Sequence, residues 1–280
     1  MPATLKPFLA LTLQHHRQLG TTIGAYLATP TESHGIFIIS ENAAVAQPSD
    51  LEDIVSPIQK DMLQQMQQIS DKALQKYFDK QTKSVAEFLD SLTRSEQLNS
   101  HVHSYVERRI AKVVALAAHS DTPIFLRKKE EKNLYEENRL NVEPEPTLPL
   151  FRFELTPDSI MYSIMAMNNG RTVNLTTTNG EVVTNNPCII RIDRTIYQFE
   201  AIDGKKLTPF LSKPYITVPK SAEKKYMQTF VLNAIRHQQV EAVGFNIVDE
   251  QHDGRAILTL EERLAGGWCL TLKFSYGDRG

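Results

Sequence analysis

The hydrophobic pattern of this chain changes its period twice, and this change constrains the fold more than any other feature. Before residue 50, and again from Asp121 onward, apolar residues tend to alternate with polar ones, as in half-buried strands. Between these points apolar residues recur every three or four positions, as in amphipathic helices. The sequence therefore predicts an α+β protein, rich in antiparallel β-structure, with a helical segment near residues 50–119.

The N-terminal residues 5–45 are predicted to form a meander of short strands. Leucines alternate from Leu9 to Leu13, a turn-like HHRQLG follows, and TTIGAYLAT and GIFIIS supply two further strands. The adjacent His15 and His16 suggest a metal site. Neighbours on a strand point to opposite faces, however, and no cysteine or acidic cluster lies nearby in the sequence. We therefore expect turn residues and no metal.

Four amphipathic helices are predicted in the helical segment, and the short polar links between them indicate a small bundle. Ser49 or Asp50 can cap the first helix, and Pro57 marks a kink or a restart. The second helix carries Tyr77 and Phe78 at the end of its apolar stripe. The fourth runs from about residue 95 to 119. On it, Arg108 and Arg109 beside Lys112 have the charge to contact phosphate, but a solvated helix edge explains them equally well.

From Asp121 the chain is predicted to form a mainly antiparallel meander. Its strand candidates are separated by turn signals, including the Asn-Gly pairs at Asn169-Gly170 and Asn179-Gly180, which favour hairpins. The proline-bearing link NVEPEPTLP, residues 141–149, is the expected boundary between two domains, 1–140 and 141–280.

The second domain is predicted to contain one long helix near residues 221–237. Ser221 is a suitable N-cap, and apolar residues then recur at helical spacing. The alternation of Val243, Phe245 and Ile247 predicts a strand directly after this helix. A last strand follows at residues 268–276, where every second residue is large and apolar.

Composition limits the function classes. The 280 residues carry a formal net charge of −2, so any contact with nucleic acid has to be local. Two widely spaced cysteines indicate neither a disulfide scaffold nor a thiolate metal site. The N-terminus lacks a signal-peptide pattern, and no run reaches the roughly 20 apolar residues of a membrane span. We therefore expect a cytoplasmic protein without a membrane partner.

No motif for catalysis is complete. Asp249-Glu250-Gln251-His252 follows an apolar run, as the acidic box of a helicase does, but the chain has no phosphate loop GxxxxGK[ST] to accompany it. The segment DEQHDG is therefore expected to be a hairpin loop. Cys188 and Cys269 each lie in an apolar strand pattern and are expected to pack rather than to react. We predict neither an enzyme nor a cofactor, although a carboxylate site assembled in space would escape detection.

One local excess of positive charge lies between residues 203 and 225. Phe210, Tyr215 and Tyr226 are interleaved with its lysines, and lysines with aromatics favour nucleic acid, since the first contact phosphates and the second stack on bases. The alternative is a solvated edge whose lysines protect exposed strands. The predicted nucleic-acid-binding residues are Lys205, Lys206, Lys213, Lys220, Lys224 and Lys225.

The chain resembles the N-terminal region, before the motor, of large bacterial helicase-like ATPases of the Swi/Snf type. The matching positions are structural, and they cover most of the chain: LALTLQHHRQLG, Pro187-Cys188 to Phe199-Glu200, Lys206-Leu207, Pro209-Phe210, Ile216 to Pro219, Tyr226, Phe230, Val240, Gly244-Phe245 and Leu272 to Tyr276. The resemblance implies that a motor lies further along a longer polypeptide. It transfers no catalytic residue to this chain.

The sequence and the resemblance together suggest two functions. The resemblance implies the first function, a non-catalytic accessory domain of a DNA-dependent helicase-type ATPase. Such a domain binds or positions DNA or RNA, or docks a motor domain or another protein. The alternative is a protein-interaction module without a nucleic-acid role, with residues 50–119 as its docking face.

Overall fold

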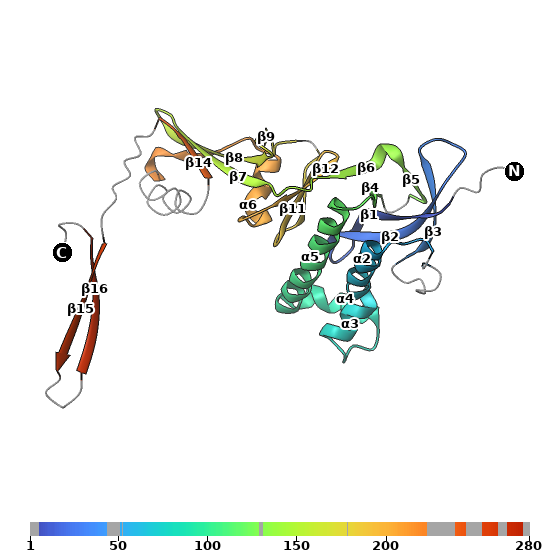
Figure 1. Ribbon diagram of the computed structural model, residues 1–280, viewed down its shortest axis with the longest axis horizontal. Helices are drawn as coiled ribbons and strands as arrows, with labels where there is room; N and C mark the ends of the chain where they lie inside the picture. The colour runs from blue at the N-terminus through green and yellow to red at the C-terminus, as the bar shows by residue number, and fades with distance from the viewer. Residues whose placement is uncertain are drawn as a thin grey trace. The chain divides into compact units, whose positions relative to one another are not determined.

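The computed structural model describes residues 6–43, 51, 53–128, 131–177, 179–222, 239–244, 254–262 and 268–276 (Figure 1). By its internal contacts the chain divides into two units, Met1–Val243 and Gly244–Gly280. None of the helices in the described part of the chain combines the length and the hydrophobicity that crossing a membrane requires.

The predicted N-terminal meander is confirmed. Strands β1 (Phe8–His16), β2 (Gly20–Pro30) and β3 (Ile36–Asn42) pair antiparallel in sequence order. The turn is shorter than expected, because His15 and His16 still pair with Thr21 and Gly20 and thus belong to β1.

The helical segment contains α2 (Pro57–Gln68), α3 (Asp71–Phe78), α4 (Val85–Arg94) and α5 (Glu96–Ala118). The predicted third and fourth helices are confirmed as α4 and α5, but the predicted second helix divides into α2 and α3. The first helix, predicted to start at Ser49 or Asp50, is wrong at residues 53–56, which are not helical. A serine side chain caps each N-terminus by accepting a backbone N–H three residues on, at Ser56, Ser70, Ser84 and Ser95. Pro57 is the first residue of α2, where its missing N–H costs nothing, so it starts a helix rather than bending one.

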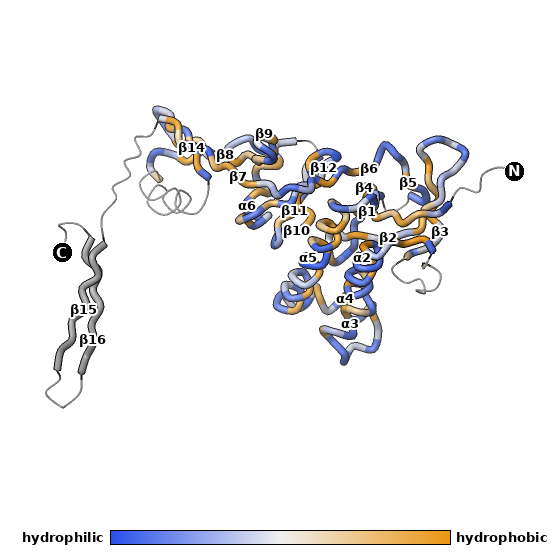
Figure 2. The backbone as a smooth tube through the Cα atoms, in the orientation of Figure 1, coloured by the Kyte–Doolittle hydropathy of each residue, from blue (hydrophilic) through white to orange (hydrophobic). Residues whose placement is uncertain are grey.

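The helices lie together on one side of the first sheet (Figure 1). Leu9, Leu11 and Leu13 on β1 share a buried core with Val106 and Ile110 on α5. The alternate residues of the sheet, including Ala10 and Ala28, form a smaller core with Phe125 and Leu134 on its other face. Along α2 and α5 hydrophilic and hydrophobic colours alternate in Figure 2, as expected of helices with one buried face.

Among the described residues, the first sheet has nine strands in the order β10-β11-β12-β6-β4-β1-β2-β3-β5. Most neighbours are antiparallel, but β4 runs parallel to β1, and β12 runs parallel to β6. The added strands are β4 (Ile124–Leu126), β5 (Asn133–Tyr135), β6 (Arg139–Val142), β10 (Glu181–Thr184), β11 (Cys188–Ile192) and β12 (Thr195–Phe199), with the 3-10 turn η1 (Glu136–Asn138) between β5 and β6.

The second sheet has the order β13-β8-β7-β14, with β9 also paired to β8. Alternate residues of β8 are buried along its whole length, as the sequence pattern indicates. The strands are β7 (Leu148–Leu155), β8 (Ser159–Asn168), β9 (Arg171–Val173), β13 (Ile216–Pro219) and β14 (Gln239–Val243), and β14 is parallel to β7.

The two Asn-Gly signals have different outcomes. Asn169 and Gly170 both have positive φ, and they form the tight turn between β8 and β9. The hairpin predicted at Asn179-Gly180 is wrong, because β9 belongs to the second sheet and β10 to the first. The strands on either side of Asn179-Gly180 therefore do not pair with each other. These two residues lie in the connection from the second sheet to the first.

The second unit contains the antiparallel hairpin of β15 (Gly254–Glu262) and β16 (Trp268–Tyr276), whose bounds include the predicted last strand. The helix predicted at residues 221–237 lies almost wholly outside the described residues, as does the segment DEQHDG. The elements confirm the α+β class. The link at 141–149 carries the chain from β6 in the first sheet to β7 in the second, and the chain later returns to the first sheet through β10. A domain division at residue 140 stays a prediction.

Candidate nucleic-acid interface

The first two predicted lysines, Lys205 and Lys206, lie on the short helix α6 (Gly204–Leu207), which the 3-10 turn η2 (Thr208–Leu211) follows directly. The side chain of Asp203 caps α6 by accepting the Lys205 N–H at 2.8 Å. The N–H of Gly204 donates to the Asn185 carbonyl at 3.0 Å. Leu207 is fully buried, so the turns are anchored to the protein by both hydrogen bonds and apolar contacts.

The lysines themselves are directed to solvent. Lys205, Lys206, Lys213 and Lys220 are all exposed, and none of them forms an ion pair with another described residue. Lys220 lies on the 3-10 turn η3 (Lys220–Ala222), directly after β13, and its Nζ donates to the Pro157 carbonyl at 3.0 Å. Lys224 and Lys225 lie outside the described residues.

The aromatic part of the prediction needs correction. Phe210 is only 2% exposed, and its ring meets that of Tyr162 edge-to-face with centroids 5.1 Å apart. It is a core residue that anchors η2 and is not available to stack on a base. Tyr215 is 49% exposed, so it can contact a ligand, while Tyr226 lies outside the described residues.

Two hollows adjoin α6. One, of about 450 Å³, places Lys205 with Glu107, Asp203 and His103. The other, of about 390 Å³, places Lys206 with Cys188 and Asp203. Carboxylates therefore lie near both lysines without pairing with them, and the local charge is mixed rather than uniformly positive.

Glu107 is the residue of this region that sequence reasoning missed. Its carboxylate accepts the backbone N–H of Asn185 at 3.0 Å, the side-chain amide of Asn185 at 2.8 Å and the Asn186 N–H at 3.3 Å. It thereby binds α5 to the turn between β10 and β11. No short-range pattern could reveal it, because its partners are almost 80 residues away.

Cys188 is buried as expected, at 2% exposed. Burial, and next the charges of Asp203 and Glu107, raise the pKa of its thiol to about 12. The thiolate is the reactive form of cysteine, so this residue is a packing side chain and not a nucleophile at neutral pH.

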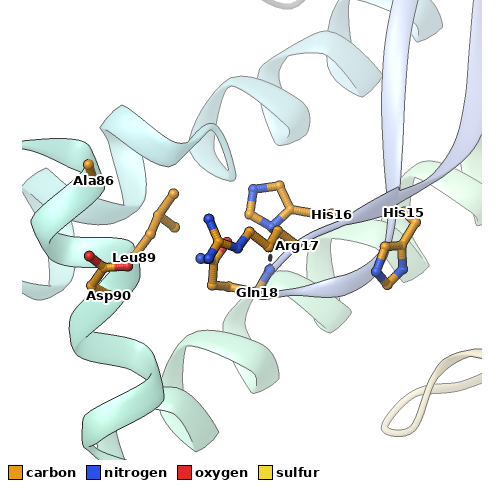
Figure 3. Close-up of a pocket in the computed structure, with 7 residues that line it drawn as sticks. All are labelled: His15, His16, Arg17, Gln18, Ala86, Leu89 and Asp90. Atoms are coloured by element: carbon orange, nitrogen blue, oxygen red, sulfur yellow. Dashed lines mark hydrogen bonds between the residues drawn. The ribbon is translucent and has the colours of Figure 1, made fainter. Parts of the chain in front are cut away.

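The paired histidines line a separate hollow of about 430 Å³, against Leu89 and Asp90 of α4 (Figure 3). The ring of His16 lies on the α4 side in Figure 3, and that of His15 is directed elsewhere. Nδ1 of His16 accepts the N–H groups of Gln18 and Leu19 at 3.3 and 3.2 Å, and Nε2 lies 3.3 Å from Oδ1 of Asp71.

Both ring nitrogens of His16 are therefore occupied by structural contacts, which leaves none for a ligand or for proton transfer. Within the described residues, no group of three or more histidine, cysteine or acidic side chains is arranged to hold a metal ion.

Comparisons with known proteins assign neither a family nor a function to this chain. No family model matches the sequence, and searches of curated proteins and of solved structures return no match.

Proposed function

We propose that this chain is a non-catalytic accessory domain that binds nucleic acid and serves a helicase-type ATPase. The observation that carries the proposal is the display of Lys205 and Lys206 on α6, and of Lys213 just after η2, with no ion pair to any described residue. Leu207 and Phe210 anchor these two turns in the core. Lysines in this state can neutralise phosphates without first breaking an internal contact.

The chemistry of Cys188 and His16 supports the non-catalytic part of the proposal. Cys188 has a raised thiol pKa, and His16 has no free ring nitrogen.

Binding of fluorescently labelled duplex DNA, followed by anisotropy over a series of salt concentrations, tests the proposal. The double variant Lys205→Gln/Lys206→Gln should bind more weakly, and its plot of log affinity against log salt should flatten by about 0.9 for each phosphate that is no longer neutralised. Exposed Lys60 and Lys132 provide the control, since Lys60→Gln/Lys132→Gln removes the same charge elsewhere. Equal weakening by both double variants would show a nonspecific charge effect, and would count against this site.

A further inference from the structure

The helical segment carries a stack of aromatic rings that ends at the surface. Tyr77, at the end of α3, and Tyr105, on α5, have ring centroids 5.1 Å apart and planes inclined by 26°. The guanidinium carbon of Arg109 lies 3.5 Å from the centroid of the Tyr105 ring. A cation at this distance leaves no room for a second ring on the same face. Tyr77 and Arg109 therefore cover opposite faces of Tyr105.

Tyr77 is the exposed end of this stack. The sequence pattern places it on an apolar stripe, but it is 66% exposed, whereas the neighbouring Phe78 packs against the core. The ring of Phe78 meets those of Tyr77 and Tyr105 nearly at right angles, at 78° and 89°. The Tyr77 ring is thus held on one side by other rings while its other side faces solvent. Such a ring is preorganised to receive one more planar group.

Arg109 provides cationic groups beside the stack. Its Nε donates to Oε1 of Gln68 at 2.9 Å, which fixes the plane of the guanidinium. Its two terminal nitrogens make no hydrogen bond with another described residue. Lys112 lies three residues further along α5, on the same side of the helix, and is exposed without an ion pair to the described residues. These groups can bind phosphate.

The α3 side of the stack is also cationic. Lys72, Lys76 and Lys80 are exposed and form no ion pair with the described residues. Two carboxylates belong to the same stretch: Asp71 contacts His16, and Asp79 accepts the N–H of Gln81 at 3.0 Å. Three lysines against these two carboxylates leave a small excess of positive charge beside the flat ring of Tyr77.

We propose that Tyr77 is a base-stacking platform for single-stranded nucleic acid, with Arg109 and Lys112 binding its phosphates. An exposed ring beside Arg109, Lys112 and an excess of lysines fits a polyanion with planar bases better than it fits an apolar protein surface. The strand has to be single, because the bases of a duplex already stack on one another. The inference goes beyond the proposed function, since it concerns a different surface and does not require the lysines of α6.

The test uses the full chain and an oligodeoxythymidylate in which one base is replaced by 5-iodouracil. Irradiation of the complex should crosslink this base to Tyr77, and peptide mass spectrometry locates the crosslink. Tyr77→Ala should weaken binding of the unmodified strand roughly tenfold, as measured by anisotropy. It should leave the salt dependence unchanged, because it removes a stacking surface and no charge. Tyr77→Phe keeps the ring and should bind within about twofold of the wild type.

Variants of the cations give the complementary result. Arg109→Gln and Lys112→Gln should each flatten the salt plot by about 0.7, the expected effect when one phosphate of a single strand is no longer neutralised. Because Tyr77 and Lys112 are exposed, thermal melts of Tyr77→Ala and Lys112→Gln should show the wild-type fold. Arg109→Gln also removes the contacts with Gln68 and Tyr105, so its melt has to be compared with the wild type before its affinity is interpreted. Unchanged affinity in a folded Tyr77→Ala variant, or a crosslink at another residue, would overturn the proposal and favour a protein partner for this surface.

These experiments distinguish failure of the Tyr77 proposal from failure of the proposed function. If the Lys205→Gln/Lys206→Gln variant loses duplex binding but still crosslinks at Tyr77, both surfaces bind nucleic acid. If duplex binding is unaffected by that variant and the crosslink still forms, only the Tyr77 site stands. If no single strand binds while duplex binding depends on α6, only the proposed function stands.

Discussion

Glu107 on α5 accepts two hydrogen bonds from Asn185, which lies 78 residues later at the turn between β10 and β11. Its other carboxylate oxygen accepts the N–H of Asn186. A single side chain thus joins the helical segment to the strand at one end of the nine-stranded sheet, beside the turns that carry Lys205 and Lys206.

Removal of this carboxylate should destabilise the protein. Glu107→Ala leaves the donors of Asn185 and Asn186 without their acceptor, and we expect a loss of about 1–3 kcal/mol in the free energy of unfolding. Glu107→Gln keeps one acceptor and should lose less. Urea denaturation measures both changes, with Glu96→Ala at the exposed start of α5 as the control, expected to cost under about 1 kcal/mol. Equal stability of Glu107→Ala and the wild type would show that the contact contributes nothing.

The raised pKa of Cys188 predicts a specific dependence on pH. The folded-state pKa is about 12, against an ordinary value of 9.0, so the folded state favours the neutral thiol. The corresponding stabilisation is complete below pH 9 and is lost as the pH rises from 9 toward 12. Other groups titrate in this range as well, so Cys188→Ala has to be compared with the wild type at each pH. The stability difference between the two proteins should become less favourable to the wild type above pH 9.

The same burial predicts slow chemical modification. At pH 8 a thiol with a pKa of about 12 is ionised to roughly one part in ten thousand, and the side chain is also inaccessible. Iodoacetamide should therefore label Cys188 in the folded protein only as fast as the protein unfolds, which peptide mass spectrometry can follow. Rapid labelling under native conditions would contradict the packing role.

The two aromatic residues near α6 should respond differently to removal. Phe210→Ala opens a cavity beside Tyr162 and should cost about 3–5 kcal/mol of stability. Tyr215→Ala, at a site that is 49% exposed, should change stability by less than about 1 kcal/mol. Thermal or urea denaturation of the two variants provides the comparison. If Phe210→Ala proved as stable as Tyr215→Ala, the assignment of Phe210 to the core would be wrong.

Gly204 should tolerate no side chain. A Cβ at this position would lie 2.7 Å from Cγ1 of Val182 and 3.1 Å from the backbone Cα of Asn185. The backbone cannot move aside as a side-chain end can, so we expect Gly204→Ala to cost about 1–3 kcal/mol and to displace α6. Lys205→Ala, on the same helix but exposed, is the matched control and should keep wild-type stability within about 0.5 kcal/mol in urea denaturation.

Local patterns predict amphipathic helices and most of the described strands, because local spacing decides both. The caps at Ser56, Ser70, Ser84 and Ser95 also have a local origin, since each side-chain oxygen accepts an N–H three residues on, but the sequence pattern predicts only the helix start near residue 95. The alternation along β8 has the same origin, since residues two apart on a strand share a face.

The same patterns gave wrong predictions where a contact with a residue distant in the sequence determines the structure. Asn179-Gly180 has the composition of a hairpin turn, but the strands beside it pair in two different sheets. Phe210 lies among lysines in the sequence and yet packs on Tyr162, and Tyr77 lies on an apolar stripe and yet faces solvent. Hydrophobic period gives the face of an element, but it does not say whether another element covers that face.

Periods and spacings within about ten residues are enough to define the α+β class, the helical segment and most of the described strands. The order of the strands in the two sheets, the contact of Glu107 with Asn185, and the stack of Tyr77, Tyr105 and Arg109 emerge only in the folded protein. Each of these brings together residues that are distant in the chain. Packing and hydrogen bonding in the whole fold determine which of these distant residues meet, and no local pattern encodes that choice.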